Sequence, residues 1–214
     1  MVKPRTPKGR ARLVHERLAE EYPEALCELD HRNPFELLTA TILSAQTTDV
    51  RVNIVTPVLF AAYPTPEDLA QADPAAVETI IRSTGFYQAK TRNVLAMAHA
   101  LLERFDGQVP TALDDLVSLP GVGRKTANVV RSVAFNLPGL AVDTHVGRLA
   151  RRLGLTTEED PVKIELELNE MVKPLERGAF SLRLILHGRR VCDAKKPRCG
   201  ACVMADFCPS RRDV

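Results

Sequence analysis

The chain has 214 residues, 45% of them hydrophobic and 26% charged, which is enough for one hydrophobic core or two small ones. No apolar run approaches the length of a membrane span, and the first twelve residues lack the apolar region of a signal peptide, so we expect a cytoplasmic protein without a membrane partner. The net charge of +2 is unevenly distributed along the chain. Residues 1–12 carry five Lys or Arg and no acid, residues 179–214 carry a net +5, and residues 13–178 carry a net −8. Basic surfaces of this kind can bind a phosphate backbone.

The segment through Arg12 is rich in proline and basic residues, and we expect a loosely held arm that is either a disordered tail or a nucleic-acid contact. An amphipathic helix that ends before Pro23 should follow, with Leu13, Leu18 and Tyr22 on its apolar face.

Pro34 is expected to open a strongly apolar helix that stops at the segment Ser44-Ala-Gln-Thr-Thr-Asp49. Asp49 is interpreted as the N-cap of the next helix, although Thr47 and Thr48 are equally suitable residue types. Gln46 ends a buried helix, where its amide needs polar partners. Taken alone it is interpreted as structural, although the gap left by a flipped-out base would also accept such a side chain.

Short helices are expected around residues 66–71 and 74–82, and a long helix is expected to end at Arg104. The segment before the long helix, Ser83-Thr-Gly-Phe-Tyr-Gln-Ala-Lys90, is a glycine turn that we interpret as a DNA-facing loop, in addition to the hairpin described next. Its aromatic residue, Phe86, is either part of such a loop or an ordinary core residue.

The stretch Leu119-Pro-Gly-Val-Gly-Arg-Lys-Thr-Ala127 predicts a helix, a glycine hairpin and a second helix that begins near Arg124. Gly121 and Gly123 are expected to take positive φ and to let the backbone approach another molecule closely. The helix that follows points unsatisfied N–H groups outward, and these attract anions. A dinucleotide fingerprint and a Walker A loop are excluded, because both need a preceding strand and a different glycine spacing.

Pro138 and Gly139 break the chain before the helix that follows, for which Asp143 or Thr144 is a suitable N-cap. A carboxylate at that position is expected to be ionised, because helix N-terminal N–H groups stabilise its charge. Further helices are predicted near residues 164–172 and 180–187. No alternating pattern of useful length occurs in the chain, so the predicted fold class is all-α.

Four of the five cysteines are clustered near the end of the chain, as Cys192-x6-Cys199-x2-Cys202-x5-Cys208. Four soft ligands this close together, without a secretion signal, indicate a metal centre rather than disulfides. Spacing alone leaves zinc and an iron–sulfur cluster open. The remaining cysteine, Cys27, is expected in the core.

The hairpin motif resembles the helix-hairpin-helix of base-excision DNA glycosylases, and most closely that of the endonuclease III family. The cysteine pattern resembles the [4Fe–4S] cluster of the same family, and motif content and order agree from about Leu13 to Cys208. The resemblance implies that Gln46 enters the gap in the DNA stack and that Phe86 is a wedge, although family members often carry an aliphatic residue there. Gly121, Gly123 and Arg124 would bind phosphates, as would Lys196 in the basic loop between the first two cysteines.

Bond breaking needs a nucleophile, and Lys125 is the candidate because it lies in the first turn after the hairpin. Its neutral form should be favoured by the helix N-terminus, by Arg124 and by partial burial. Asp143 would stabilise the cationic sugar and accept the lysine proton. His145 either lines the same cleft or is structural.

The resemblance implies two helical lobes with a DNA-binding groove between them: a six-helix barrel at residues 27–137, and a cluster lobe formed by residues 1–26 and 138–214. It implies a bifunctional DNA glycosylase/AP lyase that acts on duplex DNA containing damaged pyrimidines or abasic sites, and we expect a monomer. Two alternatives stay open, a monofunctional mismatch glycosylase and a non-catalytic helix-hairpin-helix DNA-binding protein.

Overall fold

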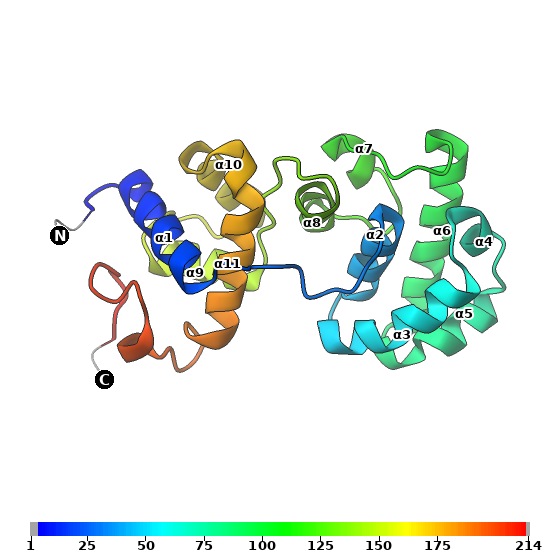
Figure 1. Cartoon of the computed structure of the whole chain (residues 1–214), viewed down its shortest axis with the longest axis horizontal. Helices are drawn as coiled ribbons and strands as arrows, with labels where there is room; N and C mark the ends of the chain where they lie inside the picture. The colour runs from blue at the N-terminus through cyan, green and yellow to red at the C-terminus, as the bar shows by residue number, and fades with distance from the viewer. Residues whose placement is uncertain (1–3, 213–214) are drawn as a thin grey trace. The chain divides into compact units, whose positions relative to one another are not determined.

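The computed structural model describes residues 4–212, and throughout that part of the chain the only regular structure is helical (Figure 1). The all-α prediction is therefore confirmed. The chain divides into two compact units, which we call the terminal unit (Met1–Leu26 and Asn136–Val214) and the central unit (Cys27–Phe135). Across the described residues, every helix is too short or too polar to cross a membrane.

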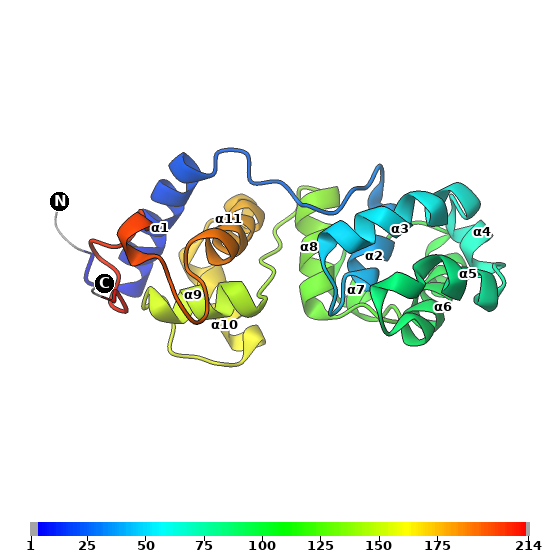
Figure 2. The same cartoon turned by 90° about the horizontal axis from the view of Figure 1, so that it is seen from below.

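The central unit is built around a fully buried helix, α2 (Pro34–Leu43). Every residue of α2 after Pro34 is buried, and α2 packs against α3, α6 and α8. Figure 2 shows α8 beside α2, and Figure 1 shows α6 running past α4 and α5. The other helices are α3 (Asp49–Ala62), α4 (Pro66–Ala70), α5 (Pro74–Ile81), η1 (Arg82–Thr84), α6 (Tyr87–Phe105), α7 (Leu113–Val117) and α8 (Arg124–Ala134).

The position of α2 in the core also determines the positions of the segments that follow it or pack against it. The residues that follow the end of α2 lead directly into the Gln46 segment, and α8, which carries Lys125, packs against the side of α2. Burying a leucine contributes about 2 kcal/mol, so the fully buried leucines of α2 make its position costly to change. The unit contains seven α-helices, one more than the six that the family resemblance implies, and two of them, α4 and α7, have only five residues each.

The terminal unit packs a second core around Phe180, which is completely buried. Helix α11 contacts both α1 and α9, and α10 contacts α1 and α9. The chain after α11 returns to α1, where Arg17 donates a hydrogen bond of 2.9 Å to Asp206. The helices of this unit are α1 (Pro7–Glu21), α9 (Thr144–Arg152), α10 (Pro161–Met171), η2 (Pro174–Glu176), α11 (Arg177–Arg190) and η3 (Cys199–Ala201).

The expectation of a loose arm through Arg12 is wrong for the described residues, because α1 begins at Pro7 (residues 1–3 lie outside the described part). Thr6 caps the helix by accepting the Gly9 N–H, and Pro7 occupies the first helical position. Arg10 donates two hydrogen bonds to the Gly154 carbonyl, at 3.1 and 2.5 Å. Lys8 and Arg12 therefore lie on the solvent side of α1, and Arg10 anchors it.

The N-cap of α3 is one of the three candidates that the sequence offers, although it is not Asp49. Thr48 is the N-cap and accepts the Arg51 N–H at 3.2 Å, whereas Asp49 is the first helical residue. An acidic residue in the first turn still interacts favourably with the helix dipole, so either residue type was compatible with this end. Cys27, expected in the core, is half-buried and packs against the edge of the central core.

Candidate active site and nucleic-acid interface

Two buried apolar residues anchor the hairpin between α7 and α8, and a glycine with positive φ forms its turn. Leu119 and Val122 are buried, and the Val122 N–H donates to the Leu119 carbonyl at 3.1 Å. Gly121 has φ +76°, and a Cβ there would lie 2.8 Å from the Cβ of Asn93 on α6. Only glycine satisfies both conditions, so this half of the hairpin prediction is confirmed.

Gly123 differs from the expectation, because its φ is −87° and it acts as the N-cap of α8. An added Cβ would meet no atom within 4 Å, so neither backbone strain nor internal packing requires glycine there. The N-cap Gly123 has no side chain that could accept a hydrogen bond from the first-turn N–H groups of α8. A glycine at that position keeps the approach to this helix end open.

Lys125 lies in the first turn of α8 on the side opposite the buried residues Ala127 and Val130. Its side chain is exposed, so the partial burial expected from the sequence is wrong for this structure. Neighbouring Arg124 is half-buried and is the first residue of the helix. Two basic side chains thus follow the hairpin directly and are presented on one helix end.

Asp143 is the N-cap of α9, and its Oδ1 accepts the Val146 N–H at 2.8 Å. This confirms Asp143 rather than Thr144 as the cap. The segment before Asp143, residues 140–142, is buried, and Ser181 of α11 donates a hydrogen bond of 2.6 Å to the Ala141 carbonyl. The carboxylate is therefore positioned from both sides, by its own helix and by α11.

His145 lies in the first turn of the same helix and accepts a hydrogen bond of 3.0 Å at Nδ1 from Arg148. The same guanidinium donates to the carbonyls of Gly188 and Cys192, each at 3.0 Å. Arg148 therefore connects the helix that carries Asp143 to the first of the clustered cysteines. The sequence does not reveal this role of Arg148, because a hydrogen bond between residues 44 positions apart leaves no local signal.

Gln46 and Phe86 are both exposed and both have positive φ, +55° and +49° respectively. A side chain larger than glycine in this region costs about 1–2 kcal/mol, and such strain is concentrated at functional sites. Phe86 is 67% exposed, which removes the alternative that it is an ordinary core residue. Each loop thus presents one strained, solvent-facing side chain at a helix end.

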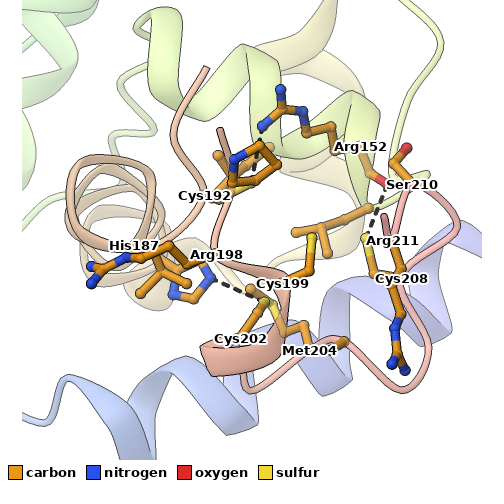
Figure 3. A pocket seen from close by; sticks show the side chains of 15 residues that line it. Arg152, His187, Cys192, Arg198, Cys199, Cys202, Met204, Cys208, Ser210 and Arg211 are labelled. Carbon is orange, nitrogen blue, oxygen red and sulfur yellow. Dashed lines mark hydrogen bonds between the residues drawn. The ribbon is translucent and has the colours of Figure 1, made fainter. Parts of the chain in front are cut away.

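The four clustered cysteines line one pocket in the terminal unit, as Figure 3 shows. Arg152 donates to the Cys192 sulfur at 3.3 Å, and Nε2 of His187 lies 3.3 Å from the Cys202 sulfur. Nδ1 of His187 is in turn 3.2 Å from the Tyr22 hydroxyl. Burial lowers the pKa of His187 to about 4, so the imidazole is neutral at physiological pH.

Four cysteine sulfurs around one pocket are a donor set that fits an iron–sulfur cluster. Among the described residues, no group of three His, Cys, Asp or Glu side chains is placed to hold one metal ion, although four sulfurs surround a common pocket. Burial raises the pKa of the Cys202 thiol to about 11, and the other three cysteines also raise it. A thiol must lose its proton to bind a metal, and the positive charge of a metal centre favours the thiolate in this buried setting.

The loop between the first two cysteines carries Lys196, which is exposed. Asp193 folds the loop back by accepting the N–H groups of Lys195 and Lys196 at 2.8 and 3.1 Å. These two backbone bonds, that of Lys196 first, lower the pKa of the Asp193 carboxyl. Arg152 holds the same loop from α9 through the carbonyls of Asp193 and Ala194, each at 2.7 Å. Lys196 is thus presented on a braced turn.

Comparisons with known proteins agree with this arrangement. Residues 39–174 match the family described as HhH-GPD superfamily base excision DNA repair protein. Residues 192–208, which span the four clustered cysteines, match the iron-sulfur binding domain of endonuclease III.

Curated relatives and solved structures extend the match over most of the chain. Endonuclease III of Synechocystis sp. is 50% identical over 90% of this chain and 89% of its own length. Endonuclease III of Escherichia coli is 41% identical over 92% of this chain and 94% of its own length. A solved structure described as a non-covalent Endonuclease III-DNA complex is 43% identical, with a TM-score of 0.90 and coverage of 95% of each chain. A trapped Endonuclease III-DNA covalent intermediate gives the same identity and TM-score, over 95% of this chain and 96% of that one.

Proposed function

The chain belongs to the endonuclease III family, and from that premise we propose that it excises oxidised pyrimidines from duplex DNA and cleaves the strand at the resulting abasic site. It is a bifunctional base-excision repair enzyme, a DNA glycosylase that is also an AP lyase. We place this activity inside the cell, where the DNA is, and expect the protein to act as a monomer, because a reader of single lesions needs no symmetry.

The placement of Lys125 carries the proposal. A glycosylase that also cuts the strand needs an amine at the sugar, because only an amine forms an imine with the opened ring. Lys125 supplies an exposed amine in the first turn of α8, directly after a hairpin that leaves the helix end open. The family resemblance implies that related monofunctional adenine glycosylases lack a lysine at this position, so Lys125 favours the bifunctional class.

Asp143 has the complementary role in the proposal. A carboxylate near the anomeric carbon stabilises the positive charge that develops on the sugar as the base departs. Its rigid placement at the N-terminus of α9 supports this role, because a preorganised charge needs no rearrangement during the reaction. The proposal requires that Asp143 of the terminal unit and Lys125 of the central unit reach the same nucleotide.

The reaction then proceeds in two stages. The neutral amine of Lys125 attacks C1′, the N-glycosidic bond breaks, and the base leaves with the bonding electrons and takes a proton from solvent, while Asp143 accepts the proton that the amine loses. The nitrogen lone pair then forms the C1′=N bond as the bond from C1′ to the ring oxygen breaks, and the ring oxygen takes the proton from Asp143, which gives a protonated imine. A proton then leaves C2′ for solvent, and the phosphate departs from C3′ with its bonding electrons. Hydrolysis of the imine restores Lys125.

The remaining residues hold the DNA open. Extruding a base costs a few kcal/mol, and side chains that fill the vacated stack offset that cost. The exposed, strained positions of Gln46 and Phe86 support this role for both. Arg124, Lys196 and the two hairpin glycines would contact phosphates, and His145 would line the cleft beside Asp143.

The two hairpin glycines should respond differently to substitution by alanine. Gly121→Ala is expected to lower the free energy of unfolding by about 1–3 kcal/mol, since it combines positive φ with a close contact to Asn93. Gly123→Ala is expected to change stability by less than about 0.5 kcal/mol, because its φ is ordinary and its surroundings are open. Both should weaken duplex binding. Chemical denaturation and a salt-controlled binding titration check the pair, and equal losses of stability would contradict the assignment.

The chain carries a [4Fe–4S] cluster, and the proposed ligands are Cys192, Cys199, Cys202 and Cys208. The contribution of the cluster is structural, because its ligands tie the basic loop to α9 and α11. Arg148 and Arg152 support this, since both bond from α9 to the loop that begins with Cys192.

Duplex DNA with one oxidised pyrimidine tests the proposed function directly. Base release and strand scission should occur together, and borohydride should trap a covalent complex. Base release without scission would instead indicate a monofunctional glycosylase. Affinity for the lesion with neither reaction would indicate a binding protein. An undamaged duplex of the same sequence is the control, and it should be neither cut nor trapped.

A further inference from the structure

The loop that carries Phe86 adopts a conformation that its own sequence does not favour. Gly85 and Phe86 are consecutive residues with positive φ, +68° and +49°. Phe86 is the N-cap of α6, yet no side chain caps this helix. Glycine adopts such angles readily, but phenylalanine does not, so the surrounding structure must hold Phe86 in place.

Lys90 is the residue that holds it. The Lys90 N–H donates to the Phe86 carbonyl at 3.0 Å, and its ammonium donates to the Thr84 carbonyl at 2.7 Å. One residue therefore binds the carbonyls on both sides of the peptide that joins Gly85 to Phe86. The hydrogen bond from the Lys90 N–H belongs to the first turn of α6 and does not restrict the chain before the helix. The hydrogen bond from the Lys90 ammonium to the Thr84 carbonyl fixes the direction of the chain that leads into α6.

The other side of the loop is anchored in the core. Thr84 is buried, and its hydroxyl donates to the Ile81 carbonyl at 2.8 Å. Ile81 is completely buried in the core of the central unit. The chain of contacts thus runs from that core through Thr84 to Lys90, while the Phe86 side chain stays in solvent.

Burying the charged ammonium of Lys90 at this position costs free energy. Only 4% of Lys90 is exposed, and burial of its ammonium lowers its pKa. A methionine or leucine would fill the same space without that penalty, so the ammonium indicates a requirement for a hydrogen bond at the Thr84 carbonyl.

We propose that Lys90 is a positioning residue that presents Phe86 for insertion into the DNA stack, an inference that rests on the proposed function as a DNA glycosylase. Lys90 does not touch the substrate in this account. It acts through the loop, and its effect on lesion binding requires the Phe86 ring.

A double-mutant cycle tests this dependence. Lys90→Met, Phe86→Ala and the double variant are compared by their affinity for duplex DNA that contains a tetrahydrofuran abasic analogue opposite 2-aminopurine. The chain has no tryptophan, so 2-aminopurine fluorescence reports base stacking with little protein background. Each single variant is expected to bind about tenfold more weakly, within the range for one aromatic stacking contact, and to reduce the fluorescence change. In the Phe86→Ala background, Lys90→Met should have less than about a twofold further effect.

Additive losses, or an unchanged fluorescence response in Lys90→Met, would overturn the inference. Lys90→Arg, which keeps the charge and the donors, should restore most of the affinity, and failure to do so would also count against it. If Lys90→Met does not fold, the same cycle is run with Thr84→Ala, which removes the hydroxyl bond to the Ile81 carbonyl. Wild-type protein that does not prefer the abasic duplex over undamaged DNA refutes the proposed function, whereas a clear preference with an additive cycle refutes the role of Lys90 alone.

Discussion

Replacing Lys125 with alanine is expected to abolish borohydride trapping on abasic duplex DNA and to slow strand cleavage by about 10³-fold or more, as removal of a covalent nucleophile does. The side chain is exposed and lies at a helix start that no side chain caps, so its loss should leave the fold intact. Single-turnover cleavage and trapping, measured beside a thermal melting curve, separate the loss of chemistry from the loss of structure.

Lys163→Ala is the matched control. Lys163 is an exposed lysine whose ammonium lies 3.5 Å from Glu158, in the terminal unit and remote in sequence from the hairpin. Its removal deletes the same amine from the surface and should leave trapping and cleavage within about twofold of wild type, since exposed ion pairs contribute little. A Lys125→Ala protein that traps and cuts as well as this control would eliminate Lys125 as the nucleophile.

Asp143→Asn should separate the chemical role of Asp143 from its role as a helix cap. Asparagine caps helices about as well as aspartate, so the melting temperature should not change, whereas loss of the negative charge should lower kcat by about 10²–10³-fold. Asp143→Ala should show the same kinetic loss together with a destabilisation of about 1 kcal/mol from the missing cap. Single-turnover base release, measured in parallel with thermal unfolding, gives both quantities.

Asp160→Asn provides the comparison, because Asp160 caps α10 in the same unit and accepts the N–H groups of Val162 and Lys163. It makes the same substitution at the same kind of position, away from the proposed chemistry. Equal kinetic effects of the Asp143 and Asp160 variants would mean that the activity depends on helix capping alone, and the proposed electrostatic role would be wrong.

The helices were largely predictable from the sequence because their ends carry local signals. Pro34, Pro66 and Pro74 each occupy the first helical position behind a polar N-cap. The start of α1 was not predictable in this way, because its basic residues resemble a disordered arm and its anchor, the Gly154 carbonyl, lies 144 residues away. Local composition does not contain that contact.

The site residues show the same distinction between local sequence signals and long-range contacts. Four closely spaced cysteines and a glycine hairpin are local patterns with few alternative explanations, so sequence alone located them. Arg148 and Lys90 were missed, because their importance depends on which carbonyl each one reaches. The exposure of Lys125 and the negative φ of Gly123 are also consequences of the folded backbone that residue types do not reveal.

The central claim is that Lys125 forms the covalent bond to DNA, and mass spectrometry of the borohydride-trapped wild-type complex tests it most directly. After protease and nuclease digestion, the reduced sugar adduct should be found on the peptide that contains Lys125, and fragmentation should place the added mass on that side chain. An adduct on another lysine, such as Lys90 or Lys196, or on the N-terminal amine, would contradict the account.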